Sequence, residues 1–142
     1  MIISNAKLID GRLVNIEIQS GVIHKIEEAQ KSQEISDYDA KGKLVIPGLV
    51  DLHTHLREPG REDSETVLTG SMAAVAGGFT AISAMANTNP VADTAGVVEQ
   101  VFRLGKAAGL VDVNPIAAVT KGLHGEQLAE LGAMADSIAR VR

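Results

Sequence analysis

Two histidines and an arginine alternate within the stretch DLHTHLREPG, residues 51–60. If residues 48–56 form a strand, side chains two positions apart share one face, so Asp51, His53 and His55 are expected to project together. Neutral imidazole nitrogens are good zinc ligands, and two of them on one strand face can bind a single ion. The second ring nitrogen of each histidine needs an orienting acceptor, for which Asp51 is the nearby candidate. The pattern predicts a metal site; the alternative is two histidines that alternate without function.

Arg57 continues this polar side beyond the two histidines. A guanidinium forms paired hydrogen bonds with a carboxylate, and its planar fork fixes the orientation of the partner. An arginine beside a metal therefore indicates an acidic small-molecule substrate. The alternative is a surface salt bridge between Arg57 and Glu58 or Glu62.

The run MANTNP, residues 85–90, places two more polar side chains, Asn87 and Asn89, after another apolar segment. If that segment is the next strand, both amides face the same rim as the histidines. An amide there is able to pair with an amide or a carboxylate of a substrate. The alternative is that asparagine and proline serve the turn alone. His24 and His124 fall in a strand segment and a loop, and are interpreted as exposed and non-functional.

The elements that must hold these residues follow from hydrophobic periodicity. After Pro47, apolar runs over residues 48–56, 79–86 and 110–120 alternate with helical patterns over residues 64–78, 94–109 and 125–137. Ser64 is the expected N-cap of the first helix, and Gly77-Gly78 its end. The strands recur about every 32 residues, the length of a βαβ unit. Apolar runs of this kind are typical of parallel strands buried on both faces. A doubly wound sheet and a barrel of eight such units both fit.

The preceding residues, 1–46, instead show the period-two pattern of short, half-buried strands. Turns are expected at Asp10-Gly11 and Ser20-Gly21, and a further hairpin around Lys41-Gly42. A small β-meander or sandwich sheet therefore precedes the alternating strands and helices.

Composition bounds the class of protein. The chain has 142 residues, of which 45% are apolar and 22% charged, the profile of a globular domain. A net charge of -5 and the lack of a basic cluster argue against a nucleic-acid surface. The absence of cysteine excludes thiolate metal sites and favours a reducing, cytoplasmic compartment. The start of the chain lacks the pattern of a signal peptide. Residues 66–92 carry no charge, but glycine, asparagine and proline within them favour a helix and a buried strand over a membrane span.

The segments IPGLVDLHTHLREPG and MANTNP resemble dihydroorotase, a member of the amidohydrolase superfamily. A His-x-His pair alone indicates only the superfamily. The arginine followed by Glu-Pro-Gly, together with the Asn-Thr-Asn-Pro run, is more specific, because related hydantoinases share the histidines but generally lack this arginine. The order of parts also agrees: a small β segment, then Pro-Gly, then the strand with the histidines.

The resemblance implies an α/β fold in two parts. Residues 1–46 would supply the N-terminal β segment of a composite β-sandwich domain, and residues 47–142 the first three βα units of a (β/α)8 barrel. A full barrel needs roughly 250 residues. The barrel is therefore incomplete in this chain, which resembles the N-terminal third of a dihydroorotase.

The resemblance also implies an activity: the zinc-dependent interconversion of N-carbamoyl-L-aspartate and L-dihydroorotate in pyrimidine biosynthesis. The complete active site would hold one or two zinc ions, and His53 and His55 would ligate the same ion. Arg57 and Asn87 would hold the substrate carboxylate, with His55 beside it. The remaining ligands and the catalytic residues are expected beyond Arg142, so these residues alone are expected to be inactive.

Two alternatives stay open at this point. A non-catalytic dihydroorotase-like subunit could serve as a scaffold for another enzyme, although it would have little reason to keep His53, His55 and Arg57 together. Another cyclic-amide hydrolase, such as an allantoinase, is the second.

Among partners, a small-molecule substrate is expected, and either a homo-oligomer or an association with another enzyme of the pyrimidine pathway. Neither nucleic acid nor a membrane is expected.

Overall fold

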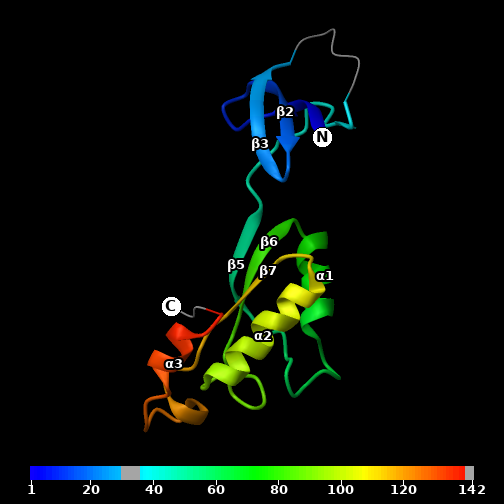
Figure 1. Ribbon diagram of the computed structural model, residues 1–142. Coiled ribbons are helices and arrows are strands. Elements are labelled where there is room, and N and C mark those ends of the chain that lie inside the picture. The colour runs from blue at the N-terminus through cyan, green and yellow to red at the C-terminus, as the bar shows by residue number, and fades with distance from the viewer. Residues whose placement is uncertain (30–35, 140–142) are drawn as a thin grey trace. The chain divides into compact units, whose positions relative to one another are not determined.

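A computed structural model describes residues 1–29 and 36–139 of the chain (Figure 1). The chain divides into two compact units, Met1–Pro47 and Gly48–Arg142. In its described residues the first contains strands and no helix, and the second alternates parallel strands with helices. The expected change from short strands to alternating strands and helices is therefore confirmed.

The first unit is a four-stranded sheet with the strand order β3-β2-β1-β4. Its strands are β1 (Ile2–Lys7), β2 (Leu13–Gln19), β3 (Val22–Glu28) and β4 (Tyr38–Asp39). The first three form the expected antiparallel meander, whereas β4 runs parallel to β1. Val14 and Ile16, two positions apart on β2, share one face and are buried against Ala6 and Ala40.

The hairpin expected around Lys41-Gly42 is wrong. A turn does form there, with positive φ at both residues and a 2.9 Å hydrogen bond from Lys43 N–H to the carbonyl of Ala40. The segments on either side of the turn, however, both run parallel to β1: Tyr38 pairs with Ile3, and Leu44 with Lys7. Turn residues fix a local bend but not the strand that the next segment joins. Residue 35, at the start of the predicted hairpin, lies outside the described residues.

The second unit contains a three-stranded parallel sheet of order β5-β6-β7 (Figure 1). Its elements are β5 (Leu49–Thr54), α1 (Val67–Ala76), β6 (Phe79–Ala84), α2 (Ala95–Ala108), β7 (Asp112–Pro115), the 3-10 turn η1 (Lys121–Leu123) and α3 (Leu131–Asp136). The sheet is open. The expectation of successive parallel βα units is confirmed, and the complete barrel stays a prediction.

A small apolar core joins α1 and α2 to this sheet. Ile82 and Ala84 of β6 and Val113 of β7 are buried against Val67 of α1 and Val101 of α2. Gly105 lets α2 approach closely, since a Cβ there would overlap the side chain of Val113. The helices thus cover one face of the sheet, while the carboxyl ends of all three strands meet at one edge, as in other parallel βα folds.

Two helix boundaries differ from the sequence prediction. The first helix is capped by Thr66, whose Oγ1 accepts a 3.1 Å hydrogen bond from Thr69 N–H, and not by Ser64. Ser64 N–H instead bonds the carbonyl of Arg61 within the preceding turn. The third helix is shorter than the expected 125–137, because Thr120 and Leu128 form a β-bridge that folds the intervening residues into a loop.

The remaining helix boundaries agree with the sequence, whereas the third strand, expected over residues 110–120, covers only Asp112–Pro115. Gly77 ends α1, and Gly109, in the left-handed region at φ 63°, ends α2. In the described parts of the chain, no helix is long and apolar enough to cross a membrane. The uncharged stretch 66–92 forms α1, β6 and the turns around them, as the sequence favoured.

Candidate metal and substrate site

The two histidines converge at the carboxyl end of β5. His53 is the last residue but one of β5, and His55 follows Thr54, the final strand residue. Their Nε2 atoms lie 3.3 Å apart, and the ring planes are inclined by 68°. Both side chains are exposed. The expected placement of the imidazoles on one side of the strand end is therefore confirmed.

This spacing fits a shared zinc ion. Two imidazole nitrogens that ligate one tetrahedral zinc at roughly 2.0–2.1 Å must lie about 3.3–3.4 Å apart. The nitrogens of His53 and His55 already have that separation. A catalytic zinc site usually has three protein ligands, and residues 1–29 and 36–139 contain no group of three histidine or carboxylate side chains placed to hold an ion. The pair fits as two ligands of a larger set.

Asp51 does not share the face of the histidines, contrary to the expectation from strict alternation. Asp51 pairs with Ile82 and Thr54 with Ala84, so three steps along β5 match two along β6. This one-residue bulge reverses the alternation and turns Asp51 toward α1, where it lines a cavity with Thr54. Its Oδ1 accepts a 2.9 Å hydrogen bond from the backbone N–H of His53. Asp51 thus supports the main chain of the bulge rather than an imidazole ring.

Asn87 contacts His55 directly. Its Oδ1 lies 2.8 Å from Nδ1 of His55, so the loops that follow β5 and β6 meet through these two side chains. The sequence pattern predicted that Asn87 lies on the same rim, but it did not predict this contact. The contact arises because β5 and β6 are neighbouring parallel strands and each side chain follows the end of its strand closely.

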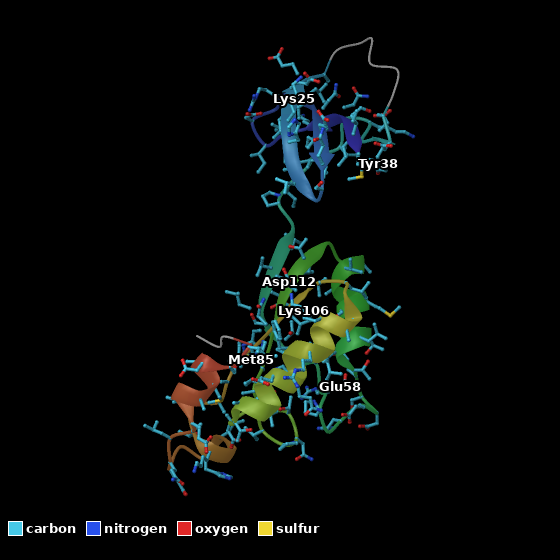
Figure 2. All side chains as sticks on the ribbon, in the orientation of Figure 1. Lys25, Tyr38, Glu58, Met85, Lys106 and Asp112 are labelled. Carbon is cyan, nitrogen blue, oxygen red and sulfur yellow. The ribbon has the colours of Figure 1, made fainter. Side chains whose placement is uncertain are left out.

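Arg57 lies on the loop after β5 with its backbone in the left-handed region, at φ 65°. The expected alternative, a salt bridge to Glu58 or Glu62, is not formed. Glu58 Oε2 accepts a 2.7 Å hydrogen bond from Val67 N–H at the start of α1, and Glu62 Oε1 accepts one of 2.8 Å from Gly60 N–H. Figure 2 shows Glu58 beside this helix. Within the described residues no carboxylate lies within 4.0 Å of the guanidinium, which leaves it available for an acidic ligand.

The two loops that carry these side chains are docked on each other. Asn89 N–H donates a 2.9 Å hydrogen bond to the carbonyl of Pro59, and Met85 N–H donates one of 2.8 Å to that of Thr54. Gly60 packs against the backbone of Asn89 so closely that any Cβ would overlap its carbonyl. The segments LREPG and MANTNP therefore form one continuous rim.

The other two histidines, His24 on β3 and His124 after η1, are exposed, as expected. Glu58 joins the loop after β5 to the start of α1, a contact that the sequence did not predict. Its position nine residues before the start of α1 carried no pattern from which a contact could be predicted.

Comparison with known proteins gives consistent matches. A family model described as "Dihydro-orotase-like" matches residues 42–141. A protein named dihydroorotase from Leifsonia xyli subsp. xyli is 61% identical over 141 residues, and one of the same name from Streptomyces coelicolor is 56% identical over 140 residues. Each alignment covers 99% of this chain, but only 32% and 33% of the relative. The chain thus spans about a third of the length of these curated relatives.

Among solved structures, L-hydantoinase (dihydropyrimidinase) from Arthrobacter aurescens is similar with a TM-score of 0.69 and 26% identity. That similarity covers 84% of this chain and 28% of the hydantoinase. Together, the matches confirm the resemblance that the two sequence motifs indicated.

Proposed function

Because the chain belongs to the dihydro-orotase-like family, we propose that it supplies the metal-binding and carboxylate-binding N-terminal part of a zinc-dependent dihydroorotase. The reaction is the interconversion of N-carbamoyl-L-aspartate and L-dihydroorotate. The observation that carries the proposal is the 3.3 Å separation of the His53 and His55 Nε2 atoms, on the same rim as an arginine without an ion pair among the described residues.

His53 and His55 would hold zinc through Nε2, as two ligands of a site that other groups complete. Zinc held there would polarise the ring amide of the substrate and lower the pKa of water to about 7. The roles left to this chain are to bind and to orient. The imidazoles point toward one place because β5 ends between them and its bulge leaves both on the side opposite the helices.

Arg57 and Asn87 would hold the substrate carboxylate. The guanidinium offers paired donors in a rigid fork, and the Nδ2 amide of Asn87 remains free to donate while Oδ1 bonds His55. Both residues lie on the docked loops next to the imidazoles. Dihydroorotate carries a carboxylate at its ring, whereas allantoin carries none, so this pair favours dihydroorotate over the allantoinase alternative.

A chimera provides the direct test. Residues 1–142 would replace the matching segment of the Leifsonia xyli dihydroorotase, and the purified chimera would be assayed for ring opening of dihydroorotate and of allantoin. We expect turnover of dihydroorotate alone. His53→Ala and His55→Ala, each introduced into the chimera, should abolish turnover and reduce bound zinc together, while His124→Ala, an exposed histidine of the same unit, should change neither.

Two outcomes would contradict the proposal. One is an inactive chimera that has the circular dichroism spectrum and thermal unfolding of the active parent. The other is full zinc content in a His53→Ala, His55→Ala double variant, which would place the metal elsewhere.

A further inference from the structure

The contact between Asn87 and His55 has a defined direction. The amide oxygen of asparagine can only accept a hydrogen bond, so at 2.8 Å the Nδ1 atom of His55 must carry the proton that it donates. A neutral imidazole has one N–H, so its Nε2 then holds a lone pair. This Nε2 atom lies 3.3 Å from Nε2 of His53.

We infer that Asn87 is a positioning residue that fixes His55 in its Nδ1–H tautomer and keeps the Nε2 lone pair directed at the metal position. The tautomer of His55 is inferred from its 2.8 Å contact with Asn87. The consequence of that tautomer for zinc binding rests on the function proposed above. Metal-bound histidines commonly donate their second ring N–H to a carboxylate, carbonyl or water, and this donation sets tautomer and ring orientation. Here an amide oxygen from the neighbouring strand end takes that part.

Asn87 is well supported for this role. The preceding residue, Ala86, is buried, and its carbonyl accepts a 3.0 Å hydrogen bond from Ala92 N–H. Asn89 N–H bonds the carbonyl of Pro59 on the loop that follows His55. The backbone on both sides of Asn87 is therefore held by hydrogen bonds, and one of them joins it to the loop that follows His55. Asp51, the acceptor expected from the sequence, is engaged with the backbone of His53 instead.

One amide would thus serve two partners, and substitutions can separate the two roles. Asn87→Ala removes both the acceptor for His55 and the donor for a carboxylate. Asn87→Asp retains an acceptor for Nδ1–H but loses the donor and adds a negative charge that repels an anionic substrate. The pair of variants therefore distinguishes positioning of His55 from recognition of the substrate.

The tautomer can be read without metal or activity. In the 142-residue chain with 15N-labelled histidine, two-bond 1H–15N correlation spectra above pH 8 distinguish Nδ1–H from Nε2–H imidazoles. We expect the Nδ1–H pattern for His55 in the parent and in Asn87→Asp, and its loss in Asn87→Ala. Asn89→Ala, in the same loop, is the matched control and should leave the pattern unchanged. The exposed His24 and His124 serve as references within each spectrum.

A control is needed to separate loss of the contact from loss of the fold. The backbone amide spectrum shows whether each variant retains the parent fold. If the chain aggregates, the same labelled histidines can be followed in the chimera. An Nε2–H pattern for His55 in the parent, or an unchanged Nδ1–H pattern in a folded Asn87→Ala, would overturn the assignment.

Zinc titration of the same variants in the chimera, where the Leifsonia xyli segment supplies the other ligands, tests the consequence for the metal. Loss of such an orienting partner typically weakens metal affinity about 10–100-fold, which is the change expected for Asn87→Ala. Asn87→Asp should stay close to the parent. Equal zinc affinity in Asn87→Ala and the parent would overturn the link to the metal. A parent without affinity for zinc would instead contradict the proposed metal site, while the tautomer would still decide whether Asn87 positions His55.

Discussion

At the scale of single residues, Arg57 shows how a charge becomes available for a ligand. Its two acidic neighbours in sequence are both engaged, Glu58 at the start of α1 and Glu62 at the backbone of Gly60. Each of these contacts stabilises the loop and removes a competitor for the guanidinium. The local fold therefore leaves the arginine unpaired among the described residues, which the sequence alone did not decide.

Replacing Arg57 by methionine in the chimera should lower kcat/KM for dihydroorotate strongly. A hydrogen bond to a charged group is worth about 1.5–3 kcal/mol, which corresponds to a loss of about 10–150-fold. Zinc content should barely change. Arg61→Met, an exposed arginine in the same loop, is the control and should retain the parent value. An Arg57→Met chimera with unchanged kcat/KM would show that the guanidinium does not hold the carboxylate.

The residues of the site were predictable to different degrees. Alternation along a strand was sufficient to bring His53 and His55 together. His53 lies within the bulge of β5 and His55 follows it, so the bulge does not separate them. Asp51 precedes that bulge, and no feature of the sequence indicates an extra residue in the strand, so its face was predicted wrongly. The contact of Asn87 with His55 depends on which strands are neighbours, which is a property of topology rather than of local pattern.

At the scale of elements, the start of α1 shows competition between possible caps. Ser64 and Thr66 are both common N-cap residues, and the sequence favoured the first. In the structure the segment before Thr66 turns back on itself, with Ser64 N–H bonded to Arg61. The Glu58 carboxylate takes the N–H of Val67, so the first helical turn begins there. Long-range contacts of this kind settle helix boundaries that local preference leaves ambiguous.

Substitution of the two candidate caps should therefore have unequal effects on α1. Thr66→Ala removes the Oγ1 atom that accepts the hydrogen bond from Thr69 N–H, but keeps the backbone N–H that donates to Thr69 Oγ1. The loss of this side-chain cap should destabilise the helix by about 1 kcal/mol. Hydrogen exchange of the α1 amides, followed by mass spectrometry, should then be about fivefold faster. Ser64→Ala should leave that exchange close to the parent rate. Faster exchange in Ser64→Ala than in Thr66→Ala would restore Ser64 as the cap.

The strand and helix order of the second unit could be predicted because its apolar runs are long and its period is regular. The pairing of the segment after Lys41-Gly42 could not, since both possible arrangements contain the same turn. The third helix was overextended because the apolar pattern continues through residues that a backbone bridge between Thr120 and Leu128 holds in a loop.

At the scale of the whole molecule, the open sheet of the second unit leaves apolar surface uncovered. Among the described residues, β5 and β7 each pair with β6 alone. Val50 is 57% exposed and Leu52 is 72% exposed on β5, and Met72 of α1 is 55% exposed. Large exposed apolar surface and unpaired strand edges both favour association.

The 142 residues alone should therefore self-associate and lack dihydroorotase activity. Size-exclusion chromatography with light scattering should give a mass above that of one chain, rising with concentration. Ring opening of dihydroorotate with added zinc should not exceed that of a His53→Ala, His55→Ala variant. Turnover above that control would show that the catalytic groups lie within this chain, and Asp51, Glu58 and Asp93 would then be the first to examine.

The docking of the loop at Pro59 and Gly60 onto the loop at Asn89 has an evolutionary consequence. Any side chain at position 60 would push on the backbone of position 89, and so shift Asn87 and, through it, the ring of His55. Changes in the two loops should therefore be non-additive, as is usual for residues in contact. A substitution tolerated in one loop would become harmful or harmless according to what the other loop already carries. Under selection, residues of the two segments should then change in a correlated way, although nearly thirty positions separate them in the chain.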